Sequence, residues 1–115
     1  MKITKSQMRE IFPKEVLAFV ETWMKENHSR NVTLEDMTGR KLYFGEDCRY
    51  IAFRNEKRAA VECGGEWGGY RKNDPINTYI EVPVGTWVVE TRYFLGYPAC
   101  TVMNWGDTQS RLGGG

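Results

Sequence analysis

The chain has few of the residues from which metal centres and nucleophilic active sites are built. It contains one histidine, His28, and three cysteines, Cys48, Cys63 and Cys100. A single histidine excludes His-rich metal sites, and the cysteines lack the spacing of a zinc knuckle or ribbon. No G-x-S-x-G motif is present, so no nucleophilic serine on a strand-to-helix turn is indicated. We therefore expect no bound metal and no cofactor.

Long apolar runs and a strong excess of one charge sign are also missing. No apolar stretch is long enough to cross a membrane or to act as a secretory signal. Three cysteines without a disulfide pattern are typical of reduced thiols, so we expect a cytoplasmic protein that does not bind membranes. The net charge of +1 gives no global attraction to nucleic acid.

What the chain does contain is the composition of an ordinary folded domain. Its 115 residues are 41% hydrophobic and 13% aromatic, which is sufficient for one hydrophobic core and too short for two. We expect residues 1–112 to form a single compact domain. Residues 113–115, all glycine, are a flexible tail or a cloning remnant and carry no information about the fold.

The first quarter of the sequence has the period of helices. Thr4 or Ser6 can cap a short helical turn, and Phe12 is biased out of the helical region because Pro13 follows it. A second helix begins at that proline and ends in the polar residues 27–31. Its expected core face is apolar at three- and four-residue spacing and contains Val16, Leu17, Val20, Trp23 and Met24. This pattern predicts an amphipathic helix that packs on a flat surface.

Beyond residue 31 the period changes to the alternation of strands. Residues 32–34 and 41–44 flank a turn-prone segment and predict a hairpin. Residues 78–82, 86–93 and 99–105 predict further strands. Short connections favour an antiparallel sheet, and five to seven strands in so few residues favour one that is strongly bent or barrel-like. The predicted fold is α+β, with the amphipathic helix on this sheet.

A further hairpin has a definite predicted register about a turn at residues 55–56. Symmetric pairing gives one almost wholly apolar face, on which Cys48, Tyr50 and Ala52 lie opposite Cys63, Val61 and Ala59. On the other face it places Arg49 opposite Glu62 and Ile51 opposite Ala60. Basic and aromatic side chains also gather on this hairpin. They could stack on bases and contact phosphates, and this alternative nucleic-acid site comprises Arg49, Phe53, Arg54, Lys57 and Arg58.

The most unusual segment is the glycine-rich stretch at residues 64–72. It is not a phosphate-binding loop, because no helix N-terminus follows it. Its side chains are of the types that dominate protein interfaces. The predicted partner-binding residues are Trp67, Tyr70, Arg71 and Lys72. The alternative is that the two aromatic side chains fold back onto the sheet.

We therefore expect a non-enzymatic module that binds a protein partner, as small accessory or inhibitor proteins do. The alternative is a domain that binds single-stranded nucleic acid. An enzyme is the third class, and it would require His28 to meet a thiol or two carboxylates to converge. An edge strand could also pair with a second copy of the chain and form a homodimer.

Overall fold

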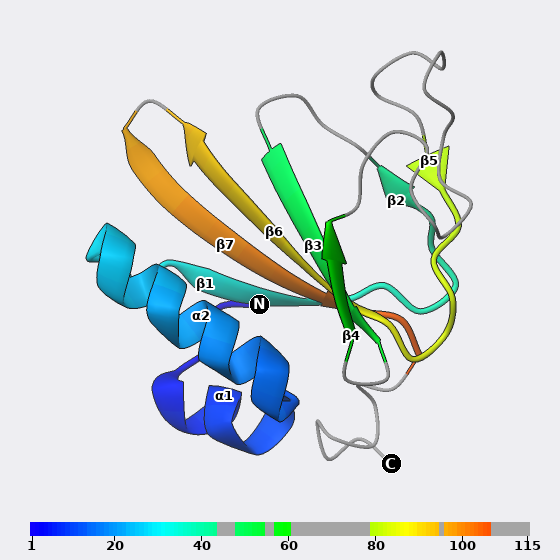
Figure 1. Ribbon diagram of the computed structural model, residues 1–115, viewed down its shortest axis with the longest axis horizontal. Coiled ribbons are helices and arrows are strands. Elements are labelled where there is room, and N and C mark those ends of the chain that lie inside the picture. The colour runs from blue at the N-terminus through cyan, green and yellow to red at the C-terminus, as the bar shows by residue number, and fades with distance from the viewer. Residues whose placement is uncertain (44–47, 55–56, 61–78, 95, 107–115) are drawn as a thin grey trace.

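The computed structural model describes residues 1–43, 48–54, 57–60, 79–94 and 96–106. Two helices come first and strands follow (Figure 1), so the predicted α+β class is confirmed. The helices are α1 (Lys5–Ile11) and α2 (Lys14–Asn27). The strands are β1 (Val32–Asp36), β2 (Leu42–Tyr43), β3 (Cys48–Arg54), β4 (Lys57–Ala60), β5 (Tyr79–Ile80), β6 (Trp87–Phe94) and β7 (Tyr97–Asn104).

Local side-chain chemistry sets the ends of α1. The Thr4 hydroxyl accepts a hydrogen bond from the Gln7 backbone N–H at 3.3 Å, and the Gln7 side chain accepts one from the Thr4 N–H at 2.9 Å. This reciprocal pair satisfies two N–H groups that the helix itself leaves unpaired. At the other end Phe12 is extended, with φ −77° and ψ 139°, as expected for a residue that precedes proline.

The end of α2 adopts a conformation that usually contains glycine. His28 lies in the left-handed region, with φ 49° and ψ 42°. Its N–H donates to the Lys25 carbonyl at 3.4 Å, and the Ser29 N–H donates to the Met24 carbonyl at 3.1 Å. These are the two hydrogen bonds of a Schellman motif, and they end the helix where the polar residues begin.

The main sheet is open and mixed. Its strand order is β1-β7-β6-β3-β4, while β2 pairs with β5 in a separate two-stranded sheet. The pairs β7–β6, β6–β3 and β3–β4 are antiparallel, whereas β1 is parallel to β7. β1, β7, β6 and β3 form the body of the layer, which is twisted but neither closed nor strongly curled (Figure 1).

The prediction of a strongly bent or barrel-like sheet is therefore wrong, and the predicted antiparallel pairing holds for every described pair of the main sheet except β1 with β7. The predicted hairpin of residues 32–34 and 41–44 is also wrong, because β1 and β2 belong to different sheets. The turn between them is present, and the Asp36 side chain accepts hydrogen bonds from the Thr38 N–H and hydroxyl. It directs the chain to the opposite face of the main sheet, where Leu42 is buried with Tyr50 and Trp105.

The register predicted for the β3–β4 hairpin is confirmed where the structure describes it. Ala52 lies opposite Ala59, and Ile51 lies opposite Ala60. The other predicted pairs involve residues 61–63, which lie outside the described residues.

Both faces of the main sheet bury apolar side chains. Val88 and Val89 are neighbours on β6, point to opposite faces and are each 0% exposed. On one face, Val89 belongs to a cluster with Val16 and Val20 of α2. On the other, Val88 packs with Leu42 and with residues of β3 and β7. The helices thus pack on one face, and the segment that contains β2 packs on the other.

The outer edge of β1 is covered by the beginning of the chain. The Leu34 N–H donates to the Met1 carbonyl at 2.8 Å, and the Ile3 N–H donates to the Val32 carbonyl at 3.3 Å. These bonds occupy backbone groups that an exposed edge would offer to another chain. The predicted homodimer through an edge strand stays a prediction.

Candidate functional site

The predicted partner-binding loop lies where the structure gives no information. Trp67, Tyr70, Arg71 and Lys72 are all outside the described residues. Their role in a contact stays a prediction.

Three of the alternative nucleic-acid residues lie on β3, and they are divided between the two faces of the sheet. Arg49 and Phe53 point from β3 toward the helices, whereas Arg54, the next residue, points to the other face. Lys57 lies opposite Arg54 in the ladder, and Arg58 lies opposite Phe53. The role of these five residues in a contact with nucleic acid stays a prediction.

Phe53 is also a core residue. Its side chain is 5% exposed, and its ring lies edge-on to that of Phe19, with centroids 5.8 Å apart and planes at 62°. A ring packed in this way is not presented to a base for stacking, which requires an open face.

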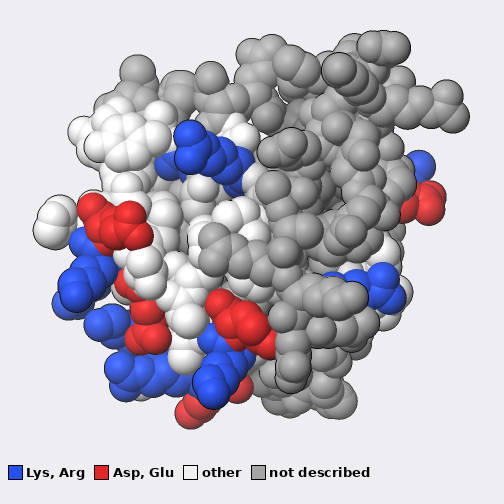
Figure 2. Space-filling model, in the orientation of Figure 1, with Lys and Arg blue, Asp and Glu red and all other residues white. Residues whose placement is uncertain are grey.

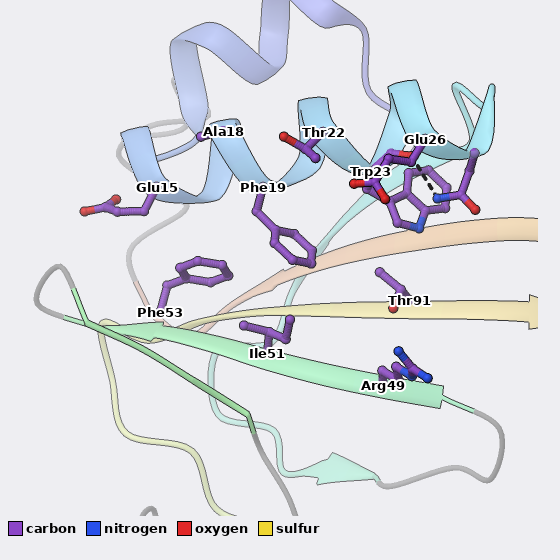
Figure 3. Close-up of a pocket in the computed structure, with 11 residues that line it drawn as sticks. Glu15, Ala18, Phe19, Thr22, Trp23, Glu26, Arg49, Ile51, Phe53 and Thr91 are labelled. Atoms are coloured by element: carbon purple, nitrogen blue, oxygen red, sulfur yellow. Dashed lines mark hydrogen bonds between the residues drawn. The ribbon is translucent and has the colours of Figure 1, made fainter.

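A groove with a volume of about 680 Å³ runs between α2 and the sheet (Figure 3). This volume is in the range of pockets that bind small molecules or side chains of a partner. Helix α2 forms one wall, and β3 forms the floor together with Thr91 of β6 (Figure 3). The lining residues are Glu15, Ala18, Phe19, Thr22, Trp23, Glu26, Asn27, Arg49, Ile51, Phe53 and Thr91.

The wall consists of a second stripe on α2, distinct from the stripe that enters the core. Val16, Val20 and Met24 are the buried residues of this helix. Phe19 and Trp23 lie one above the other on the adjoining flank, because residues four apart are neighbours on a helix surface. Both are only partly buried. The apolar surface of α2 is therefore wider than its contact with the core.

The floor of the groove is apolar at one end and polar at the other. Phe19 and Phe53 meet from opposite sides, and Ile51 lies beside them on β3 (Figure 3). Farther along the strand, Arg49 and Thr91 line the groove beneath the end of α2 that contains Trp23 (Figure 3). The structure thus gathers apolar surface in the groove and places polar groups around it.

The charged groups of the groove are two carboxylates and one guanidinium. Glu15 and Glu26 lie on α2, and Arg49 lies on β3. None of the three forms an ion pair with another residue that the structure describes. Elsewhere, basic and acidic side chains are intermingled over the helices on the face that Figure 2 shows. The groove therefore differs from the surrounding surface in its apolar lining, and not in a strong electrostatic potential.

Cys100 does not resemble a nucleophile. It is 1% exposed in the core beneath the helices. Burial, with a smaller effect from the charge of Glu90, raises the pKa of its thiol from 9.0 to about 12. The thiol therefore stays protonated at neutral pH, whereas nucleophilic cysteines have a lowered pKa.

His28 and the described cysteines, Cys48 and Cys100, do not line the groove. His28 is exposed at the end of α2 and lines a separate hollow with Lys5, Lys25 and Arg30. Among the described residues, no three His, Cys, Asp or Glu side chains are grouped so that they could hold a metal ion.

Most of the groove was missed at the level of sequence. Arg49 and Phe53 were among the predicted residues, but for contact with nucleic acid. Trp23 was assigned to the core face, and Phe19 was assigned to neither face. The signal that could have found the groove is the pair Phe19 and Trp23, which extends the apolar arc of the helix beyond the arc of Val16, Val20 and Met24.

No helix among the described ranges has the length and apolar character needed to cross a bilayer. Comparison of the chain with protein-family models, with curated proteins and with solved structures finds no match in any of the three.

Proposed function

We propose that this protein is a binding module whose groove between α2 and β3 receives a segment of a partner protein. The observation that supports the proposal is the partial burial of three large apolar side chains, Phe19, Trp23 and Ile51, in one open groove. When a partner covers apolar surface that was in contact with water, the complex is stabilised by about 25 cal/mol for each Å² buried. Contiguous apolar surface that the domain leaves uncovered commonly marks an interaction site.

The geometry favours binding over acid–base catalysis in this groove. Glu15 and Glu26 are its two carboxylates, and they are eleven residues apart on one helix. At 1.5 Å per residue this separation is about 16 Å along the axis. Pairs of carboxylates that act together on one bond lie about 5 to 9.5 Å apart. The two carboxylates therefore act at different points along a ligand.

A direct test is to fill the groove from its wall. Thr22 is exposed and lines the groove, so Thr22→Trp adds bulk there without changing the core. Lys14→Trp is the matched control, since Lys14 is exposed on the same helix and does not line the groove. The probe is a phage-displayed library of random peptides selected on the wild-type protein.

Peptides selected on the wild type should bind Thr22→Trp at least about tenfold more weakly, which corresponds to a loss of about 1.4 kcal/mol. They should bind Lys14→Trp as tightly as they bind the wild type. Thermal unfolding of both variants shows whether they are folded. If the peptides bind folded Thr22→Trp and the wild type with equal affinity, the groove is not the binding site and the proposed function is wrong.

A further inference from the structure

The carboxylates of the groove stand at its two ends with the apolar surface between them. Glu15 lies in the first turn of α2, near Phe53, and Glu26 lies in the last turn, near Trp23 (Figure 3). Phe19 and Ile51 occupy the space between (Figure 3). Neither carboxylate is paired with a residue in the described parts of the chain. Both can therefore accept a cation from a ligand.

From this arrangement, and resting on the proposed function, we infer the chemistry of the ligand. The groove binds a protein segment in which an aromatic or aliphatic side chain lies between two basic residues. The apolar side chain is buried against Phe19, Trp23 and Ile51. Lysine or arginine side chains on either side meet Glu15 and Glu26.

The spacing of the basic residues follows from the length of the groove. The carboxylates are about 16 Å apart along the helix, and an extended chain advances about 3.3 Å per residue. An extended segment therefore places its two basic residues about five positions apart. The long, flexible stems of lysine and arginine allow this spacing to vary by a residue or two.

The same charges disfavour nucleic acid in this groove. Two carboxylates and one guanidinium line it, so a phosphate backbone would meet more repulsion than attraction. The ring of Phe53 is buried against that of Phe19, which removes the aromatic surface predicted for base stacking. A basic peptide matches the apolar lining and both carboxylates, whereas a polyanion would find only the Arg49 guanidinium.

The test compares two double variants with the same change in net charge. Glu15→Gln with Glu26→Gln removes both carboxylates from the groove. Glu10→Gln with Glu21→Gln is the control, since Glu10 lies on α1, Glu21 lies on another flank of α2, and neither lines the groove. The probe is the phage-displayed library of random peptides, with peptides long enough to span both carboxylates.

Selection on the wild type at low salt should enrich peptides with an apolar residue between two basic ones. Their affinity should fall about tenfold for the groove variant, since exposed ion pairs each contribute a factor of roughly two to five. Affinity for the control variant should be unchanged apart from a small long-range effect. High salt should reduce the difference between wild type and groove variant, because screening weakens exposed ion pairs.

Failure of this inference can be distinguished from failure of the proposed function. Enriched peptides without basic residues, which bind the groove variant as tightly as the wild type but lose affinity for Thr22→Trp, would overturn only the inference. Peptides that are insensitive to Thr22→Trp, or no enrichment at all, would overturn both. Salt-sensitive binding of a single-stranded oligonucleotide that Thr22→Trp abolishes would reassign the groove to nucleic acid. Dimerisation lost in Thr22→Trp would reassign it to a second copy of the chain.

Discussion

The contact between Phe19 and Phe53 holds α2 over β3, and a double-mutant cycle can measure it. The change is Phe→Leu at each position, which removes the ring but keeps an apolar side chain in place. Phe53 is 5% exposed and Phe19 is only partly buried. We expect Phe53→Leu to lower the free energy of unfolding by about 1 to 2 kcal/mol, and Phe19→Leu to lower it by roughly half as much.

The informative quantity is the coupling between the two substitutions. The ring centroids are 5.8 Å apart and the planes are 62° from parallel, an edge-to-face arrangement that contributes about 0.5 to 1.5 kcal/mol beyond its buried area. The double variant should therefore be less destabilised than the sum of the single variants by about that amount.

Urea unfolding followed by circular dichroism supplies all four free energies. A control cycle combines Phe19→Leu with Met103→Leu, because Met103 is buried on the face of the sheet opposite the helices. That cycle should be additive within about 0.5 kcal/mol. Additivity of the Phe19 and Phe53 cycle as well would show that α2 does not lie over β3 in solution, and the proposed groove would lose its wall.

Three further expectations concern the elements that support the groove. Val20→Ala should lower the free energy of unfolding by about 2 kcal/mol, because Val20 of α2 is 0% exposed. Thr22→Ala changes an exposed position on the same helix and should not lower it. Equal losses for the two variants in urea unfolding would argue against packing of α2 on the sheet. His28→Gly should be more stable than His28→Ala by about 1 kcal/mol, since the residue has φ 49°, and a calorimetric order reversed from this would exclude the left-handed helix end. The Cys100 thiol has a pKa of about 12 in the native protein against 9.0 for an exposed thiol, so the native state keeps a proton that the unfolded state loses above pH 9. The stability of the wild type should therefore fall relative to that of Cys100→Ala by about 1 kcal/mol per pH unit above pH 9. Parallel curves of stability against pH would show that the thiol is not buried.

Features determined by neighbouring residues could be predicted from the sequence. The cap at Thr4 and the break at Phe12 depend on contacts or steric clashes within a few positions. The register of the β3–β4 hairpin follows from a turn at residues 55–56 and an apolar face that a slip of one residue would disrupt. In each case the chain contains both interaction partners within a short segment.

The position of β1 could not be predicted, because its partner is distant in the sequence. Val32 lies opposite Cys100 in a parallel pair, and the alternation of residues 32–34 would be the same next to any strand. A hairpin with residues 41–44 was the local solution. The structure instead buries Val32 under the helices and Leu42 on the opposite face. This arrangement is stabilised by contacts across the whole sheet, not by the local segment. The same arrangement explains why the sheet is open rather than barrel-like.

The groove itself follows from a mismatch of widths that only the assembled sheet shows. A helix with its side chains is about 10 to 12 Å across, whereas five strands at about 4.8 Å spacing extend roughly 19 Å between the outer two. Helix α2 alone cannot cover such a sheet, and it is centred toward the side that contains β1 and β7 (Figure 1). Ile51 on β3 then lies at the margin of the helix, and the Phe19–Trp23 flank of α2 lines the groove beside it. Sequence periodicity identifies which residues of a helix are apolar, but the width of the sheet decides which of them remain for a partner.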